Sequence, residues 1–190
     1  MATYKTNKVI PQMSNNTTPA PFVASASSVL ATRAAYRAFD YSIGTDNHWL
    51  ANATTGWLKI DLGIAYRVGK YIMTDVGENQ TVRDPKNWTI QGSSNGADYI
   101  TLDTRTGFTW TNTESKTFYI LNPINYRYYK VDVTLNNGDA TYMGIGELVF
   151  YELGTPSGFS GGQPWVFMKD MWEKHNKIFR PKGILIPEGI

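Results

Sequence analysis

Short stretches in which apolar and polar residues alternate run through residues 33–153 and predict an all-β domain. In Trp57–Leu62 the charged residues Lys59 and Asp61 stand between apolar ones, which is the pattern of a strand that buries one face. Turn residues separate the stretches, and only Arg33–Ala38 has a helical pattern. Further strands are expected at Tyr66–Thr74, Trp88–Gln91, Tyr99–Leu102, Lys116–Leu121, Tyr126–Thr134 and Gly146–Glu152.

Strands at this spacing, without helices between them, indicate a β-sandwich or jelly roll. Such folds carry their functional residues on the loops at the two ends of the sandwich. We expect Trp49 and Trp88 to lie in the core, because each ring buries a large apolar area. Asp61 is expected to accept backbone hydrogen bonds where its strand ends.

The two ends of the chain differ from this domain, which we place at residues 22–153. Residues 1–21 are small, polar and rich in proline, which fits either a flexible tail or an extended strap along the domain. Residues 154–164 form a Gly/Ser/Pro-rich linker. Residues 165–190 begin with a short amphipathic helix. Its apolar side carries Trp165, Met168, Met171, Trp172 and Phe179.

This C-terminal helix has two possible roles. It can fold back on its own sandwich, or it can dock on another chain. A face with two Trp and two Met residues resembles the anchors of protein interfaces, which favours docking on a partner or on a second copy.

Composition and charge exclude several classes of protein. The chain has no cysteine and two histidines, which excludes disulfide frameworks, iron–sulfur clusters, cysteine nucleophiles and multi-histidine metal sites. Residues 1–153 carry 13 basic and 13 acidic residues, so we expect no nucleic-acid partner and no electrostatic docking on membranes. Apolar runs do not reach the ~20 residues of a membrane span, and residues 1–12 have no apolar signal-peptide region. The sequence offers no convincing Ser-His-Asp set, so we expect no catalysis.

Four motifs occur in one order along the domain: AFD at 38–40, GWLKIDLG at 56–63, RDPKNWTIQGSSNG at 83–96 and IGELVFYE at 145–152. Together they resemble the discoidin, or coagulation factor V/VIII type C, family, which includes the family-32 carbohydrate-binding modules. The resemblance implies a galactose-binding-like jelly roll that binds a glycan or another cell-surface ligand. The N-terminal residues also resemble the leader of such domains in bacteriophage virion proteins. That second resemblance implies a virion-surface or extracellular protein whose C-terminal segment docks on another virion subunit.

The resemblance also implies a ligand site on the loops 50–56, 75–84 and 135–144. Our candidates there include His48 and Asp75. Arg83 is the best hydrogen-bond donor. It also stands in the family's structural RDP motif, so a packing role is equally possible. Tyr142 is the best stacking residue, and Trp110 is an alternative platform. The ligand-binding residues we select are Asn52, Glu78, Asn79, Arg83 and Tyr142.

A structural Ca²⁺ is implied as well. Calcium needs six to eight oxygen ligands. The positions that match the family's ion site are Asp40, Asn47 and Glu147, and the alternative is that these carboxylates only cap loops.

Two functions therefore remain open at the level of the sequence. The first is a non-catalytic module that recognises a glycan on a cell surface. The second is a purely structural virion protein, such as a capsid decoration or a neck or tail connector, that binds no sugar.

Overall fold

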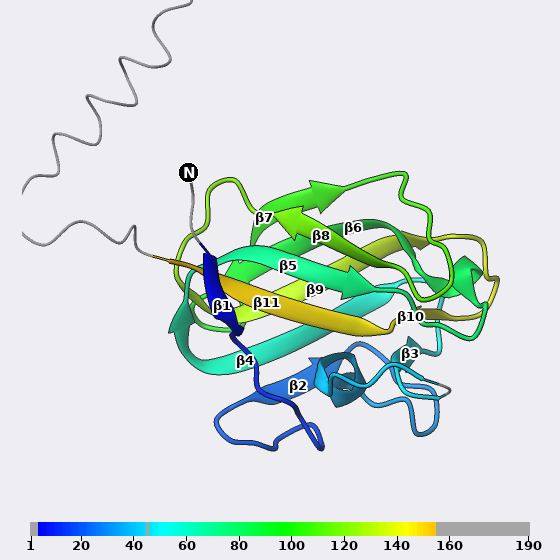
Figure 1. Cartoon of the computed structure of the whole chain (residues 1–190), viewed down its shortest axis with the longest axis horizontal. Coiled ribbons are helices and arrows are strands. Elements are labelled where there is room, and N and C mark those ends of the chain that lie inside the picture. Colours follow the sequence, from blue (N-terminus) through cyan, green and yellow to red (C-terminus); the bar gives the residue numbers. More distant parts are fainter. Residues whose placement is uncertain (1–3, 45, 155–190) are drawn as a thin grey trace, which may run out of the picture. The chain divides into compact units, whose positions relative to one another are not determined.

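The computed structural model describes residues 4–44 and 46–154, which form a β-sandwich of two antiparallel sheets (Figure 1). The five-stranded sheet has the order β2-β4-β9-β6-β7, and the four-stranded sheet has the order β1-β11-β5-β8. The first sheet consists of β2 (Val23–Ala26), β4 (Gly56–Tyr66), β9 (Tyr126–Asn136), β6 (Pro85–Ser93) and β7 (Ile100–Arg105). The second consists of β1 (Tyr4–Lys8), β11 (Glu147–Leu153), β5 (Val68–Thr74) and β8 (Ser115–Tyr119).

Smaller elements complete the domain. A two-stranded ribbon joins β3 (Trp49–Ala51) to β10 (Met143–Ile145). Two short 3-10 helices, η1 (Ala35–Phe39) and η2 (Thr81–Arg83), lie on connections between strands. The predicted all-β sandwich is therefore confirmed for the described residues, and the helical pattern at 33–38 corresponds to η1.

The core lies between the two sheets and is strongly aromatic. Trp49 and Trp88 are 0% and 1% exposed, as predicted. The Nε1 of Trp88 donates to the hydroxyl of Tyr71, so the buried ring has its polar atom satisfied. Strand β9 turns Tyr129, Val131 and Val133 inward, as its alternating pattern indicates.

Trp110 is a correction to the sequence analysis. We expected an exposed ring on a loop, but the ring is 7% exposed and its Nε1 donates to the carbonyl of Pro85 at 2.7 Å. The ring packs against Trp88, with 6.2 Å between centroids. Trp110 therefore belongs to the core and offers no stacking platform.

The N-terminal segment is an extended strap. Strand β1 pairs with β11, and the apolar side chains of Ile10 and Met13 are each 1% exposed. The N–H of Met13 donates to the carbonyl of Phe39 at 3.1 Å. The strap thus adds a fourth strand to one sheet and covers part of the core.

Several strand boundaries differ from those expected. The predicted strand Tyr66–Thr74 crosses a turn, because Tyr66 ends β4 and β5 begins at Val68. Strands β3 and β10 were not predicted; each has three residues, too few for a periodic pattern to show. Asp61 accepts a hydrogen bond from the N–H of Gly63 at 2.8 Å, as expected.

The predicted C-terminal helix and its docking residues Trp165, Met168, Met171, Trp172 and Phe179 lie outside the described residues. Within the described part of the chain, no helix has the length and apolar character needed to cross a membrane.

Candidate functional site

Strand register gathers four connecting segments at one end of the sandwich. Thr74, the last residue of β5, lies opposite both Glu147 and Ser115, where β11 and β8 begin. On the other sheet, β6 begins opposite the end of β9. Segments 52–55, 75–84, 107–114 and 137–142 therefore emerge together, near β3 and β10 in Figure 1. We call this part of the domain the loop end.

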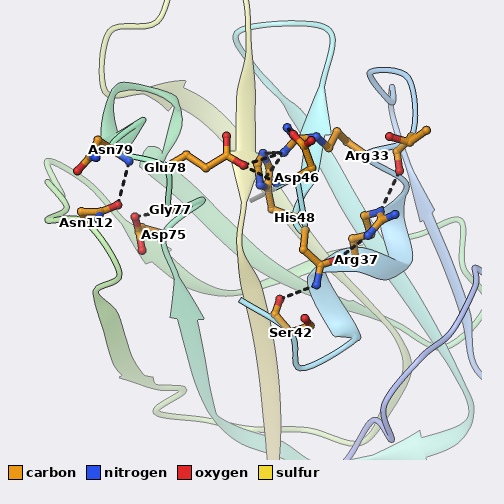
Figure 2. A network of polar contacts seen from close by, with 12 residues as sticks. Arg33, Arg37, Ser42, Asp46, His48, Asp75, Gly77, Glu78, Asn79 and Asn112 are labelled. Atoms are coloured by element: carbon orange, nitrogen blue, oxygen red, sulfur yellow. Dashed lines mark hydrogen bonds and ion pairs between the residues drawn. The ribbon is translucent and has the colours of Figure 1, made fainter. Parts of the chain in front are cut away.

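Arg33 is the centre of a polar cluster at the loop end (Figure 2). Its Nη1 lies 2.8 Å from Nδ1 and 2.6 Å from Nε2 of His48, and its Nη2 pairs with the carboxylate of Asp46. Nη1 also lies 3.7 Å from Oε1 of Glu78. These four residues form the Arg33 cluster, which joins the segment before η1 to two separate loops.

Burial differs sharply within the Arg33 cluster. His48 is 1% exposed, while the Asp46 side chain is 70% exposed. The side chains of Arg33 and Glu78 lie between these limits, at 13% and 21%. The cluster therefore has a fixed, buried base and a carboxylate that is open to solvent.

Backbone hydrogen bonds connect the same loops. The N–H of Asp46 donates to the carboxylate of Glu78, which reaches across from the neighbouring loop in Figure 2. The N–H of Asn79 donates to the side-chain oxygen of Asn112 at 3.0 Å. Three loops that are distant in sequence are thus held in one arrangement.

Backbone strain is concentrated in these loops. Six non-glycine residues among those described have positive φ, and five of them lie in the three connected loops. Such conformations are costly for most residues with a Cβ, and they cluster at functional sites. The five residues are Tyr41, Asp46, Glu78, Asn79 and Thr113.

The environment of His48 keeps its imidazole neutral. Burial, and next the positive charge of Arg33, lower the pKa of His48 to about 4. Burial also lowers the pKa of Arg33, which the charge of Glu78 opposes. A neutral imidazole can accept a hydrogen bond from the guanidinium, so His48 orients Arg33 and does not repel it.

Arg83 and Tyr142 come together beside the Arg33 cluster. The Nε of Arg83 donates to Oδ2 of Asp139 at 3.0 Å, and its guanidinium lies 5.3 Å from the centroid of the Tyr142 ring. The charge of Arg83 acts on the pKa of both Arg33 and His48, so the two arginines face one region. Arg83 combines a loop-holding contact with guanidinium N–H groups that this ion pair does not use.

The other predicted ligand residues are placed differently. Asn79 is exposed next to Glu78, and Asn52 is exposed in the turn between β3 and β4. Asp75 is 1% exposed, so it lies beneath the surface and not on it. Arg33 and Asp46 are not among the ligand residues predicted from the sequence, because no motif links them to His48 or Glu78.

Two of the three residues predicted to bind Ca²⁺ also meet. Asp40 and Glu147 are 7% and 4% exposed, and the N–H of Ser42 donates to both carboxylates, at 2.9 and 3.1 Å. Burial, and next the adjacent Asp40, raise the pKa of Glu147 to about 9. Oε2 of Glu147 is buried and accepts no hydrogen bond from the described residues. An oxygen pair of this kind fits a cation as ligands.

Asn47 does not fit the same role. Its side-chain oxygen accepts a hydrogen bond from the guanidinium of Arg37, and its Nδ2 donates to the carbonyl of Ser42 at 3.1 Å. Within residues 4–44 and 46–154, no three His, Cys, Asp or Glu side chains lie close enough to hold a metal ion. Further oxygen ligands would have to be backbone carbonyls or water.

Comparison with protein families identifies the domain. The model of the F5/8 type C domain matches residues 23–148, more than half of the chain. The chain belongs to the F5/8 type C domain family. This confirms the resemblance found for residues 22–153. Among curated proteins, none matches the chain significantly.

Several solved carbohydrate-binding domains share the fold. The family-32 carbohydrate-binding module of Clostridium perfringens NanJ, solved in complex with galactose, is 25% identical, with a TM-score of 0.57 over 69% of this chain and 93% of that one. The lectin domain of lectinolysin, solved with Lewis b antigen, is 17% identical, with a TM-score of 0.61 over 79% and 99%. A chitosan-binding module from a Paenibacillus sp. IK-5 chitosanase/glucanase is 21% identical, with a TM-score of 0.56 over 69% and 94%. The F5/8 type C domain described here thus has the fold of non-catalytic carbohydrate-binding modules.

Proposed function

We propose that this F5/8 type C domain binds a glycan at its loop end. The observation that carries the proposal is the Arg33 cluster, in which charged donors and acceptors from two strained loops and from the segment before η1 are held in place by a buried, neutral His48. Preorganised polar groups of this kind suit hydroxyl recognition, because little ordering remains to be done when the ligand binds. The solved relatives that bind galactose and Lewis b support the same function.

The residues at the loop end can make three kinds of contact with a sugar. Asp46 and Glu78 offer carboxylate oxygens to sugar hydroxyls, and Arg33 and Arg83 offer N–H groups. Tyr142, beside Arg83, offers a ring face for stacking. Each of the two arginines already pairs with a carboxylate, which favours a neutral sugar over an anionic one.

A glycan array followed by titration of the best ligand tests the proposal. Arg83→Ala and Tyr142→Ala are each expected to weaken binding about 10-fold or more without unfolding the domain. Matched controls are Arg127→Ala and Tyr119→Ala, which lie toward the other end of the sandwich, near the start of β9 and the end of β8. Equal loss of affinity in the controls, or no ligand on a broad array, would favour a purely structural role.

We further propose that Ca²⁺ binds to Asp40 and Glu147 in this domain. The ion would neutralise two buried carboxylates and hold the 40–47 loop, which carries Asp46, against β11. A chelator is expected to lower the melting temperature, since an ion bound only to the folded state stabilises it. Asp40→Asn should abolish that response; an unchanged melting temperature in the wild type would contradict the ion.

We infer from the sequence that the protein is displayed on a virion and is anchored through residues 165–190, with a purely structural virion protein as the alternative. The support is the apolar side of the expected helix and the linker before it. A chain that ends at Gly154 should keep its melting temperature, because the described unit has its own core. It should also lose its partner, and Trp172→Ala in the full chain should have the same effect. Unchanged assembly of both variants would contradict the anchor.

A further inference from the structure

A second pair of buried carboxyl groups lies beneath the loop that carries Glu78 and Arg83. Asp75 opens this loop and Asp84 closes it, directly after β5 and before β6. Asp75 is 1% exposed and Asp84 is 0% exposed, so neither carboxyl group reaches bulk water.

One oxygen of each carboxyl group has a backbone donor. The N–H of Gly77 donates to Oδ2 of Asp75 at 3.0 Å, and the N–H of Val76 donates to Oδ1 of Asp84 at 2.8 Å. The other oxygens, Oδ1 of Asp75 and Oδ2 of Asp84, are buried and accept no hydrogen bond from the described residues. Oxygens of this kind are rare in folded proteins and indicate that a water or an ion is bound there.

The charge of this pair is not balanced by the part of the chain that the structure describes. Burial raises the pKa of Asp84 to about 8, and the charge of Asp75 contributes. Burial also raises the pKa of Asp75, and the nearby Glu114 adds to that effect. The hydrogen bond from Gly77 opposes it, as do the N–H groups of Thr113 and Glu114, which lie nearby without forming a hydrogen bond to Oδ1. Arg83, the adjacent cation, pairs with Asp139, and no ion pair within residues 4–44 and 46–154 involves Asp75 or Asp84.

A proton shared directly between the two carboxyl groups does not account for both unpaired oxygens. Within the described residues no hydrogen bond joins Asp75 to Asp84, and the charge of Asp75 affects the pKa of Asp84. Asp84 lies next to Asp75, because it accepts the N–H of Val76, and each residue has one buried carboxylate oxygen without a hydrogen-bond donor. Two such oxygens fit an ion that bonds to oxygen at 2.3–2.6 Å. A divalent ion would also neutralise both charges at once.

We propose that Asp75 and Asp84 bind a Ca²⁺ ion through Oδ1 and Oδ2, respectively, at a site separate from Asp40 and Glu147. The ion ties the two ends of the 75–84 loop together and thereby fixes the positions of Glu78 and Arg83. This inference does not rest on glycan binding, and it holds or fails independently of it.

Asp84→Asn and Asp75→Asn are the test variants, because an amide oxygen can still accept the hydrogen bond from Val76 or Gly77 while the negative charge is lost. Asp98→Asn is the matched control, a carboxylate beyond the far end of β6 that accepts a hydrogen bond from Asn95 at 2.8 Å. All variants are made in the full chain, both in the wild type and in an Asp40→Asn/Glu147→Gln background. That background removes the ligands of the other proposed ion.

The readouts are isothermal titration with Ca²⁺ and the melting temperature with Ca²⁺ or EDTA. The Asp40→Asn/Glu147→Gln protein should still bind one Ca²⁺, and an excess of about 100 times Kd should raise its melting temperature by roughly 5–10 °C. Adding Asp84→Asn or Asp75→Asn should abolish both the binding of Ca²⁺ and the rise in melting temperature. Adding Asp98→Asn should leave both unchanged. In the wild-type background, Asp84→Asn should remove one bound ion.

Two results would overturn the proposal. One is a background protein that neither binds Ca²⁺ nor changes its melting temperature, which would mean that a water or a proton satisfies the two oxygens. The other is an Asp84→Asn protein that binds as many Ca²⁺ ions as the wild type. If the background protein does not fold, the wild-type comparison alone decides.

Discussion

The guanidinium of Arg33 contacts the buried imidazole of His48, with Nη1 2.8 Å from Nδ1 and 2.6 Å from Nε2. The contact is stable because burial and Arg33 itself keep the imidazole neutral. It gives Arg33 a fixed orientation at the surface, from which the guanidinium pairs with Asp46 and Glu78. A side chain upstream of η1 therefore controls the arrangement of two loops that follow it.

Replacement of Arg33 should affect ligand binding more than any other single change in the loops. Arg33→Ala leaves Glu78 without its cation and His48 without its donor, so we expect at least a 10-fold loss of glycan affinity. Arg33→Lys should recover little of this affinity, because an ammonium group cannot bridge several acceptors as a planar guanidinium does. Titration of both variants checks this, with Arg127→Lys as a control. Full affinity in Arg33→Lys would show that only the positive charge matters.

The pH dependence of stability should carry a contribution from His48. The pKa of His48 is about 4 in the folded protein and 6.5 in the unfolded chain. Between these two pH values the unfolded chain binds the proton and the folded chain does not. The contribution of His48 is therefore complete above pH 6.5 and is lost as the pH falls toward 4. Urea unfolding of the wild type and of His48→Gln from pH 4.5 to 7 checks this. The variant should show a flatter dependence, and equal slopes would contradict a neutral, buried imidazole.

Relief of backbone strain should stabilise the loop end. Thr113 is β-branched and has a φ of +63°, a conformation that glycine adopts without steric cost. Thr113→Gly should therefore raise the free energy of unfolding by up to about 1 kcal/mol. Thr117→Gly is the control, because Thr117 is exposed in the extended strand β8 and should lose stability. Destabilisation of both variants to the same extent would show that Thr113 is not strained.

Gly146 should tolerate no side chain. A Cβ at this position would overlap the backbone carbonyl of Asp75, the first residue after β5, whereas a Cβ on Gly44 would meet no atom within 4 Å. Gly146→Ala should therefore cost about 3 kcal/mol or more and displace the start of the 75–84 loop. Gly44→Ala should change the free energy of unfolding by less than about 1 kcal/mol. Chemical denaturation of the two variants measures both effects, and similar small losses would refute the close approach.

The residues of the candidate site could be predicted only in part from the sequence. Glu78 and Arg83 could be selected because the resemblance to the family implies a ligand site on the loop that carries them. Arg33 could not be selected, since it is the first residue of a short helical pattern and its partners Asp46, His48 and Glu78 are 13, 15 and 45 residues away along the chain. Asp75 is a candidate from the sequence, and only its exposure of 1% shows that it lies beneath the surface.

The sequence by itself determined the elements that depend on local periodicity: the alternation in β4 and β9, the buried Trp49 and Trp88, and the role of Asp61 at a strand end. Those features follow from which residues can bury one face of a strand. Tertiary structure alone decided that the N-terminal segment is a strap, that Trp110 is in the core, and that two pairs of carboxyl groups are buried. The reason is that each depends on which strands lie side by side, and strand pairing joins segments that no local pattern connects.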